Sequence, residues 1–324
     1  MKFATIGHLD SESRLKQIPR EWIKEKRDLI VSPELNINNT KGYIIALKIT
    51  AQHMMNLPKS TVRQKILDSV LFAQNELDVN IIQLGALTTS VTSGGLWVSE
   101  QDEFTGFVNH GDSYTAAITC KIVEKALNIL KKESLDLNIA IVGAYGIIGE
   151  AVSKILVPRF QHSILIGRRE KKLEELSKNL IGNYDITTSL KTKSADIIVT
   201  ATSHPTALLN SNNLKKNAII VDVSQPVNLT KDVCQRRPDI FRIDGGYVDF
   251  PIRQKIPIPG MPSGKIFSCI AEVIMQAMEN EQKNHVGSID MEYLKKTETL
   301  GEKYKFVLSE LTNFGVPINN MYKI

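Results

Sequence analysis

The sequence predicts an α/β protein whose centre is a doubly wound parallel sheet. Between about residues 135 and 244, apolar runs of strand length alternate with helical patterns at the spacing of βαβ units. The first of these runs leads into three glycines spaced Gly-x-x-Gly-x-x-Gly, and a helical pattern follows them. Together these observations predict a Rossmann-type sheet, with an N-terminal α/β domain before it and a C-terminal helical segment after it.

The N-terminal α/β domain is expected over residues 1–133, where strand-like and helical pieces are mixed. Apolar residues predict strands at 43–49 and 80–85. Residues 60–71 begin with cap-type residues and then repeat apolar positions at helical spacing. Asp112 or Ser113 caps a further helix that is predicted to run to about residue 132.

The Rossmann-type domain is expected over residues 134–250. Helical stretches are predicted at residues 146–156 and 171–180. The strands of its sheet are predicted at residues 138–142, 163–166, 196–200, 218–223 and 240–243.

The C-terminal helical segment covers residues 251–324. Its main feature is an amphipathic helix predicted over residues 264–281. We expect this segment to pack back on the N-terminal domain and to carry a nucleophile, for reasons given below.

Composition limits the function classes. The 324 residues are 42% hydrophobic and 23% charged, which is typical of a folded globular protein. The apolar runs are far shorter than a membrane span, and the N-terminus lacks the apolar core of a signal peptide. The net charge of +5 is spread along the chain, which disfavours nucleic acid and is compatible with an acidic partner. The six histidines and three cysteines lack metal-ligand spacing, so we predict a cytoplasmic protein without a metal site.

The glycine motif indicates a dinucleotide. Gly143 allows the tight turn, Gly146 lets a pyrophosphate approach the backbone, and Gly149 brings the helix close to the strand. The phosphates then lie at the N-terminal end of a helix, where free N–H groups favour anions. The intervening Tyr145, Ile147 and Ile148 belong to the same turn and are predicted cofactor contacts.

The end of the second strand distinguishes the two nicotinamide cofactors. Arg168 and Arg169 stand where an NAD enzyme usually has an acidic residue that accepts the ribose 2′-hydroxyl. Guanidinium groups match the oxygens of a 2′-phosphate, so the predicted cofactor is NADPH. Thr202 and Ser203 follow a later strand of the same sheet, at the edge where doubly wound sheets bind ligands, and complete the predicted cofactor site.

The three cysteines differ in their surroundings. Cys120 lies on the apolar stripe of its helix, which predicts a core residue, and Cys234 falls in a polar, exposed stretch. Cys269 lies at the edge of an apolar helix face, near the helix start, with Glu272 three residues later. A helix N-terminus lowers the pKa of a thiol, so a Cys269 thiolate is able to attack a thioester and hold the acyl group. From these residues alone, an inert buried cysteine is an equally good interpretation.

Taken together, these motifs resemble those of the long-chain acyl-[acyl-carrier-protein] reductases known from cyanobacteria. The most specific match is residues 266–272, around Cys269, although the family usually has Tyr-Ala-Cys-Met where this chain has Phe-Ser-Cys-Ile. Matching stretches lie in the same order along nearly the whole chain, at residues 6–9, 42–44, 84–88, 115–116, 142–149, 222–226, 245–246 and 266–272.

The resemblance implies a reaction. Cys269 becomes the nucleophile that takes the acyl group from an acidic acyl carrier protein, and NADPH then reduces the acyl-enzyme to a fatty aldehyde. Glu272, which is expected to tune the thiol, is the second predicted catalytic residue. It also implies a substrate tunnel in the N-terminal domain. The acyl group stays open among fatty, short and aminoacyl thioesters, because the chain differs from the family around Cys269.

Two other functions remain open from the sequence. The first is direct hydride transfer to a small ketone, as in shikimate dehydrogenases, which needs a Lys/Asp pair for which Lys48, Lys59 and Asp112 are candidates. The second is a non-catalytic NADP(H)-sensing module in which Cys269 is inert. Reactivity of Cys269 separates the acyl reductase from both.

Overall fold

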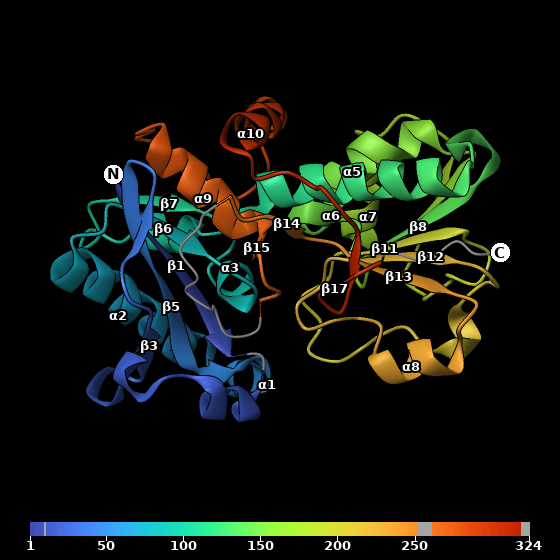
Figure 1. Ribbon diagram of the computed structural model, residues 1–324. Helices are drawn as coiled ribbons and strands as arrows, with labels where there is room; N and C mark the ends of the chain where they lie inside the picture. Colours follow the sequence, from blue (N-terminus) through green and yellow to red (C-terminus); the bar gives the residue numbers. More distant parts are fainter. Residues whose placement is uncertain (10, 252–260, 319–324) are drawn as a thin grey trace. The chain divides into compact units, whose positions relative to one another are not determined.

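The computed structural model describes residues 1–9, 11–251 and 261–318, and the chain forms two compact units (Figure 1). Unit 1 contains Met1–Tyr114 and Val248–Val307, and unit 2 contains Thr115–Tyr247 and Leu308–Ile324. The first division falls inside one helix, α5 (Asp112–Leu130), and not at the predicted boundary near residue 133. Each unit therefore includes segments from distant parts of the sequence.

Unit 1 is built on a seven-stranded sheet in the order β2-β3-β5-β1-β6-β7, with β4 also paired to β5. The pairs β5–β1, β1–β6 and β6–β7 are parallel, whereas the outer strands β2, β3 and β4 run antiparallel to their neighbours. The strands are β1 (Lys2–Leu9), β2 (Ile23–Lys24), β3 (Leu29–Val31), β4 (Leu35–Ile37), β5 (Thr40–Thr50), β6 (Ile81–Leu84) and β7 (Phe107–Asn109).

Helices cover this sheet, as Figure 1 shows for α2 and α9. Val62, Ile66 and Val70 of α2 are buried in one cluster with apolar residues of β1, β5 and β6. Helix α9 contacts β1, β5 and β6 as well as the neighbouring helix α10. The helices of this unit, besides the start of α5, are α1 (Ala51–Asn56), α2 (Lys59–Leu77), α3 (Leu87–Val91), α4 (Leu96–Ser99), α9 (Ser268–Met278) and α10 (Met291–Tyr304).

Unit 2 confirms the predicted fold class. The six strands of its main sheet are all parallel, in the order β10-β9-β8-β11-β12-β13. A helix follows each of the first two of these strands along the chain. The elements are β8 (Asn138–Val142), α6 (Ile147–Leu156), β9 (His162–Ile166), α7 (Glu170–Ser177), β10 (Tyr184–Thr187), β11 (Ile197–Thr200), β12 (Ile219–Asp222), α8 (Lys231–Arg236) and β13 (Phe241–Asp244).

Two differences from the sequence-based elements matter for the site. The sequence analysis did not predict β10, because its residues are only partly buried and show no apolar run. The helix expected over residues 264–281 begins only at Ser268, since residues Lys265–Phe267 form strand β15, which pairs with β14 (Tyr247–Asp249). The ammonium of Lys265 lies 2.7 Å from Asp249 Oδ1 and ties these two strands together.

The remaining C-terminal strands, β16 (Thr312–Asn313) and β17 (Val316–Pro317), form a short antiparallel pair in unit 2. The expected C-terminal segment, residues 251–324, is thus divided between the two units, and its residues 252–260 and 319–324 lie outside the described part. Among the described residues, every helix is too short or too polar to span a bilayer.

Candidate functional site

The turn between β8 and α6 has the close backbone packing expected of a dinucleotide site. Gly143 has φ +88°, a conformation that favours glycine, and a Cβ at this position would overlap the carbonyl oxygen of Ala201. A Cβ on Gly149 would overlap the carbonyl oxygen of Gly143. Both glycines are therefore required by the packing of this turn, as the sequence predicted.

The first turn of α6 leaves backbone donors free. Gly146 is the N-cap residue and provides no side chain, and the first helical hydrogen bond runs from the Glu150 N–H to the Gly146 carbonyl. The N–H groups of Ile147, Ile148 and Gly149 precede that bond and have no partner within the helix. Such a turn fits a pyrophosphate, which accepts these hydrogen bonds.

The two arginines lie just after β9, which is the neighbour of β8 in the sheet. Arg168 and Arg169 are exposed, and neither forms an ion pair with any residue that the structure describes. The Arg169 guanidinium carbon lies 5.9 Å from the centre of the Tyr145 ring, and Gly167 packs directly under that ring. The structure thus brings Tyr145 together with the two cations at the end of β9.

Thr202 lies against the glycine turn. A Cβ on Gly143 would be 3.0 Å from Thr202 Cγ2, and the Thr202 hydroxyl donates to Asn228 Oδ1 at 3.1 Å. Ser203 follows as an exposed residue. The predicted cofactor residues therefore all lie in unit 2 around one edge of its sheet.

Cys269 lies in unit 1, as the second residue of α9. Cys269 is half-buried, as is Cys234 on α8, whereas Cys120 is buried. Gly111, with φ +71°, packs directly on it, because a Cβ on Gly111 would lie 2.5 Å from Cys269 Cβ and 2.8 Å from Cys269 Cα. The loop that leads from β7 into α5 therefore covers one side of the cysteine.

Two carboxyl groups flank the thiol. Glu272 is completely buried, its Oε2 accepts the Tyr114 N–H at 2.7 Å, and its Oε1 has no partner among the described residues. Asp112 is the first residue of α5 and directly follows Gly111. Burial raises the pKa of Glu272 to about 8 and that of Asp112 to about 7.

These surroundings correct one expectation about Cys269. The helix start was expected to lower the thiol pKa, and the backbone N–H groups of Cys269 and Ile270 act in that direction. Burial, followed by the negative charges of Asp112 and Glu272, outweighs them and raises the pKa of the Cys269 thiol to about 12. At neutral pH the thiol is therefore protonated in the ligand-free chain.

A network of buried polar side chains holds the loop against α9. The amide of Asn109 donates to Gln276 Oε1 at 2.8 Å, and its Oδ1 accepts the Gly111 N–H at 2.5 Å. His110 Nδ1 accepts the Asp112 N–H at 2.9 Å, and its backbone N–H donates to the His285 carbonyl. Burial, with the charge of His285, lowers the pKa of His110 to about 3, so its imidazole is neutral.

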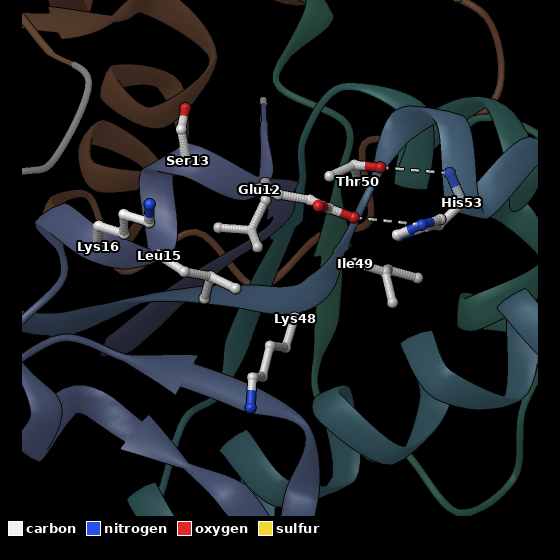
Figure 2. A pocket seen from close by; sticks show the side chains of 9 residues that line it. Glu12, Ser13, Leu15, Lys16, Lys48, Ile49, Thr50 and His53 are labelled. Atoms are coloured by element: carbon white, nitrogen blue, oxygen red, sulfur yellow. Dashed lines mark hydrogen bonds and ion pairs between the residues drawn. The ribbon is translucent and has the colours of Figure 1, made fainter.

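Unit 1 also has a pocket of about 500 Å³, shown in Figure 2. It lies where β1 and β5 end, and the aliphatic side chains of Leu9, Leu15 and Ile49 line it. An ion pair of 3.6 Å between Glu12 and His53 crosses its polar side (Figure 2). The pocket lies beyond the carboxyl ends of β1 and β5, and the loop beside Cys269 follows the carboxyl end of β7, which is parallel to them in the same sheet.

His110 and Gly111 were not predicted to be site residues, and Asp112 was predicted only as a helix cap and as part of the ketone alternative. The sequence feature that could have identified these residues is a run of polar residues with one glycine, residues 109–112, directly between a strand and a long helix. For that alternative, Lys48 Nζ lies 2.5 Å from Glu25 Oε2 and is held in an ion pair. Among the described residues, no three potential metal ligands lie close enough to hold an ion.

Comparison with known families matches the nucleotide-binding part. Residues 124–245 match the model of the shikimate/quinate 5-dehydrogenase family, a range that lies wholly in unit 2 and excludes Cys269. A solved L-tryptophan dehydrogenase from Nostoc punctiforme is 16% identical, with a TM-score of 0.46 over 95% of this chain and 80% of that one.

Two curated relatives are reductases. The long-chain acyl-[acyl-carrier-protein] reductase of Synechococcus elongatus is 27% identical over 93% of this chain and 96% of its own length. The glutamyl-tRNA reductase of Methanobrevibacter smithii is 27% identical over 42% of this chain and 35% of its own length. The glycine cradle and these comparisons support a nicotinamide-dependent oxidoreductase.

Proposed function

We propose that the protein reduces the thioester of an acyl-carrier protein to an aldehyde, with NADPH as the reductant and Cys269 as the nucleophile. The observation that carries this proposal is the position of Cys269. It is half-buried at the start of α9, between two carboxyl groups, in a chain whose other unit has a dinucleotide cradle. The relative from Synechococcus elongatus, named for this reaction, supports the substrate class.

The chain's own groups perform the acyl transfer. Cys269 Sγ forms a bond to the thioester carbonyl carbon, the bond from that carbon to the carrier sulfur breaks, and the thiol proton ends on the departing carrier thiol. The result is an acyl group on Cys269. When bound, the nicotinamide cofactor supplies the hydride that reduces this group to the aldehyde. The bond to Sγ then breaks, and a proton from solvent restores the thiol.

Other features agree with this substrate. The pocket lined by Leu9, Leu15 and Ile49 offers apolar surface in the unit that contains Cys269. The net charge of +5 agrees with an acidic carrier protein.

The decisive test is intact-mass spectrometry after mixing the protein with acyl-carrier-protein thioesters in the absence of NADPH. We expect a mass gain equal to the acyl group in the wild-type chain and in Cys234→Ala, and no gain in Cys269→Ala. Cys234 is the matched control because it is also half-buried but lies in unit 2. No gain with fatty, short and aminoacyl thioesters would reject the covalent mechanism.

The match to the shikimate/quinate 5-dehydrogenase model favours a second function, direct hydride transfer to a small ketone. That function needs no cysteine. Turnover of a free ketone that survives in Cys269→Ala would replace the thioester mechanism with it.

We propose that Arg168 and Arg169 bind the 2′-phosphate of NADPH, because both are exposed cations without acidic partners in the described chain. Replacing both with alanine is expected to weaken NADPH at least tenfold and NADH little, as measured by fluorescence titration. Arg236→Ala is the control, since that exposed arginine of unit 2 is paired to Asp232. Equal losses for the two cofactors would contradict the assignment.

A further inference from the structure

The proposed acyl transfer needs a group that takes the proton from the Cys269 thiol. The thiol is protonated at neutral pH, because burial and two neighbouring carboxyl groups oppose its ionisation. Attack on a thioester by Sγ therefore requires proton removal as the new bond forms. The residues around Cys269 offer three candidates, which are His110, Glu272 and Asp112.

His110 is unsuited to this role. Its Nδ1 already accepts the Asp112 N–H at 2.9 Å, so in the neutral imidazole the proton is on Nε2. Neither ring nitrogen then has a free lone pair for the thiol proton. Its burial and its neighbour His285 keep the ring in this neutral form.

Glu272 has a different task. One of its oxygens accepts the Tyr114 N–H, so this buried carboxyl caps the first turn of α5 from the neighbouring helix α9. The side chain of Asn109 and the N–H of Ser113 also favour the ionised form of this carboxyl group, but burial outweighs them and raises the pKa of Glu272 to about 8, so it holds its proton at neutral pH. Glu272 is thus a positioning residue that holds the start of α5 beside Cys269.

Asp112 differs from both. Its carboxyl group forms no hydrogen bond or ion pair with the residues in the described ranges. It directly follows Gly111, whose backbone packs on Cys269 Cβ, and its negative charge acts on both the thiol and Glu272. We infer that Asp112 is the proton acceptor for the Cys269 thiol during acyl transfer, which rests on the proposed function.

The proton balance of the step is complete within these groups. The Sγ–H bond breaks as Sγ bonds to the acyl carbon, and the proton moves to the Asp112 carboxylate. When the bond between the acyl carbon and the carrier sulfur breaks, the same proton moves to the departing thiolate. Asp112 is a carboxylate again at the end of the transfer.

Two rates measured on the same protein test this inference. The first is alkylation of Cys269 by iodoacetamide without substrate or cofactor, which needs only thiolate. The second is acylation of Cys269 by an acyl-carrier-protein thioester, followed by mass spectrometry. In Asp112→Asn we expect faster alkylation, about tenfold for each unit by which the thiol pKa falls. We expect acylation to become slower by about 100-fold or more, because the proton acceptor is lost.

A merely electrostatic neighbour would give a different pattern, with alkylation and acylation both faster in Asp112→Asn. That result, or an unchanged acylation rate, would overturn the inference. Glu272→Gln is the matched variant, because an amide oxygen still accepts the Tyr114 N–H while the charge is removed. It is expected to retain acylation within about tenfold of the wild type.

The wild-type pH profiles give a second measurement that needs no variant. Acylation is expected to rise with a midpoint near the pKa of Asp112, about 7, whereas alkylation continues to rise above pH 9 with the thiol. Of the groups named around Asp112, Glu272 on α9 also titrates in this range, with a pKa of about 8, whereas the pKa of His110 is about 3 and that of the thiol is about 12. Coincident profiles would contradict the inference. Normal alkylation with no acylation by any thioester would instead reject the proposed function, and this inference with it.

Discussion

At the scale of single residues, the dinucleotide turn depends on two glycines for different reasons. A side chain on Gly149 would overlap the Gly143 carbonyl oxygen, which is backbone and has no room to move. A side chain on Gly146 would lie 3.1 Å from the same oxygen and meets less resistance. Packing of the protein therefore excludes a side chain at Gly149, whereas the proposed approach of a pyrophosphate excludes one at Gly146.

This contrast gives a prediction. Gly149→Ala is expected to lower the free energy of unfolding by about 1–3 kcal/mol, because overpacking forces α6 away from β8. Gly146→Ala is expected to keep most of the stability and to lose NADPH affinity. Thermal unfolding and a fluorescence titration measure the two effects. Equal destabilisation by both variants would mean that Gly146 serves packing alone.

Cys269 shows how far local sequence predicts chemistry at this scale. Its position at a helix start was predicted, and the direction of its pKa shift was not. Burial is the main cause of the raised thiol pKa, and the packing of Gly111 contributes to it; the negative charges of Asp112, more than 150 positions away in the sequence, and of Glu272 follow. The local pattern around Cys269 contains Glu272 but neither Gly111 nor Asp112.

At the scale of elements, one buried carboxyl joins α9 to α5. Glu272 accepts the Tyr114 N–H, and burial raises its pKa from the ordinary 4.5 to about 8. The folded chain thus binds this proton more tightly than the unfolded chain does. The contribution of Glu272 to stability is fully present below about pH 4.5 and is lost as the pH rises toward 8.

We therefore expect Glu272→Gln to change the pH dependence of unfolding. The amide still accepts the Tyr114 N–H and never ionises. The free energy of unfolding of the variant should therefore rise above that of the wild type by about 1–3 kcal/mol between pH 5 and pH 9. Urea unfolding at several pH values measures this gain.

The control is Glu279→Gln, at the C-terminal end of α9. There the ion pair with Lys303 lowers the carboxyl pKa, so its loss should cost stability at neutral pH and little in acid. A difference between Glu272→Gln and wild type that does not vary with pH would show that Glu272 is ionised when buried.

At the scale of the whole molecule, the chain returns to each unit after leaving it. The last described strands belong to unit 2, where Asp244 accepts from the Thr312 hydroxyl at 2.8 Å and from the Gly315 N–H at 2.8 Å. Asp244 also lies 2.6 Å from the guanidinium of Arg242, which is buried between Asp244 and Asp222. The β16–β17 pair is therefore attached to the sheet of unit 2 through the Asp244 carboxylate and through Arg242, whose guanidinium donates to Asn313 Oδ1 at 3.2 Å.

Replacing Asp244 with alanine is expected to lower the free energy of unfolding by about 3–5 kcal/mol, because it leaves the buried guanidinium of Arg242 without one partner and releases β16–β17. Hydrogen exchange should show lost protection at residues 312–317 first. Asp232→Ala is the control, since its ion pair with Arg236 is exposed and is expected to contribute less than about 1 kcal/mol. Unchanged protection in Asp244→Ala would show that other contacts hold this pair of strands.

Much of unit 2 was predictable because its elements are short-range patterns. Strand β8 agrees with the predicted range, α6 begins one residue later than predicted, and the other predicted strands end within one residue of the structure. A buried parallel strand is a continuous apolar run, and a dinucleotide turn is a local glycine pattern. Strand β10 was missed because neither signal is present in its partly buried residues.

The sequence by itself thus determined the fold class, the order of the βαβ units, the glycine turn and the cysteine that a resemblance singled out. Only the tertiary structure decided which segments share a unit and which groups surround Cys269. Residues 109–112 reach it through the pairing of β7 with β6 and through the bond from Asn109 to Gln276. The physical reason is the range of the interactions. Backbone conformation and amphipathic faces depend on neighbours in the chain, whereas burial and the charges that act on a thiol depend on residues that only folding brings near.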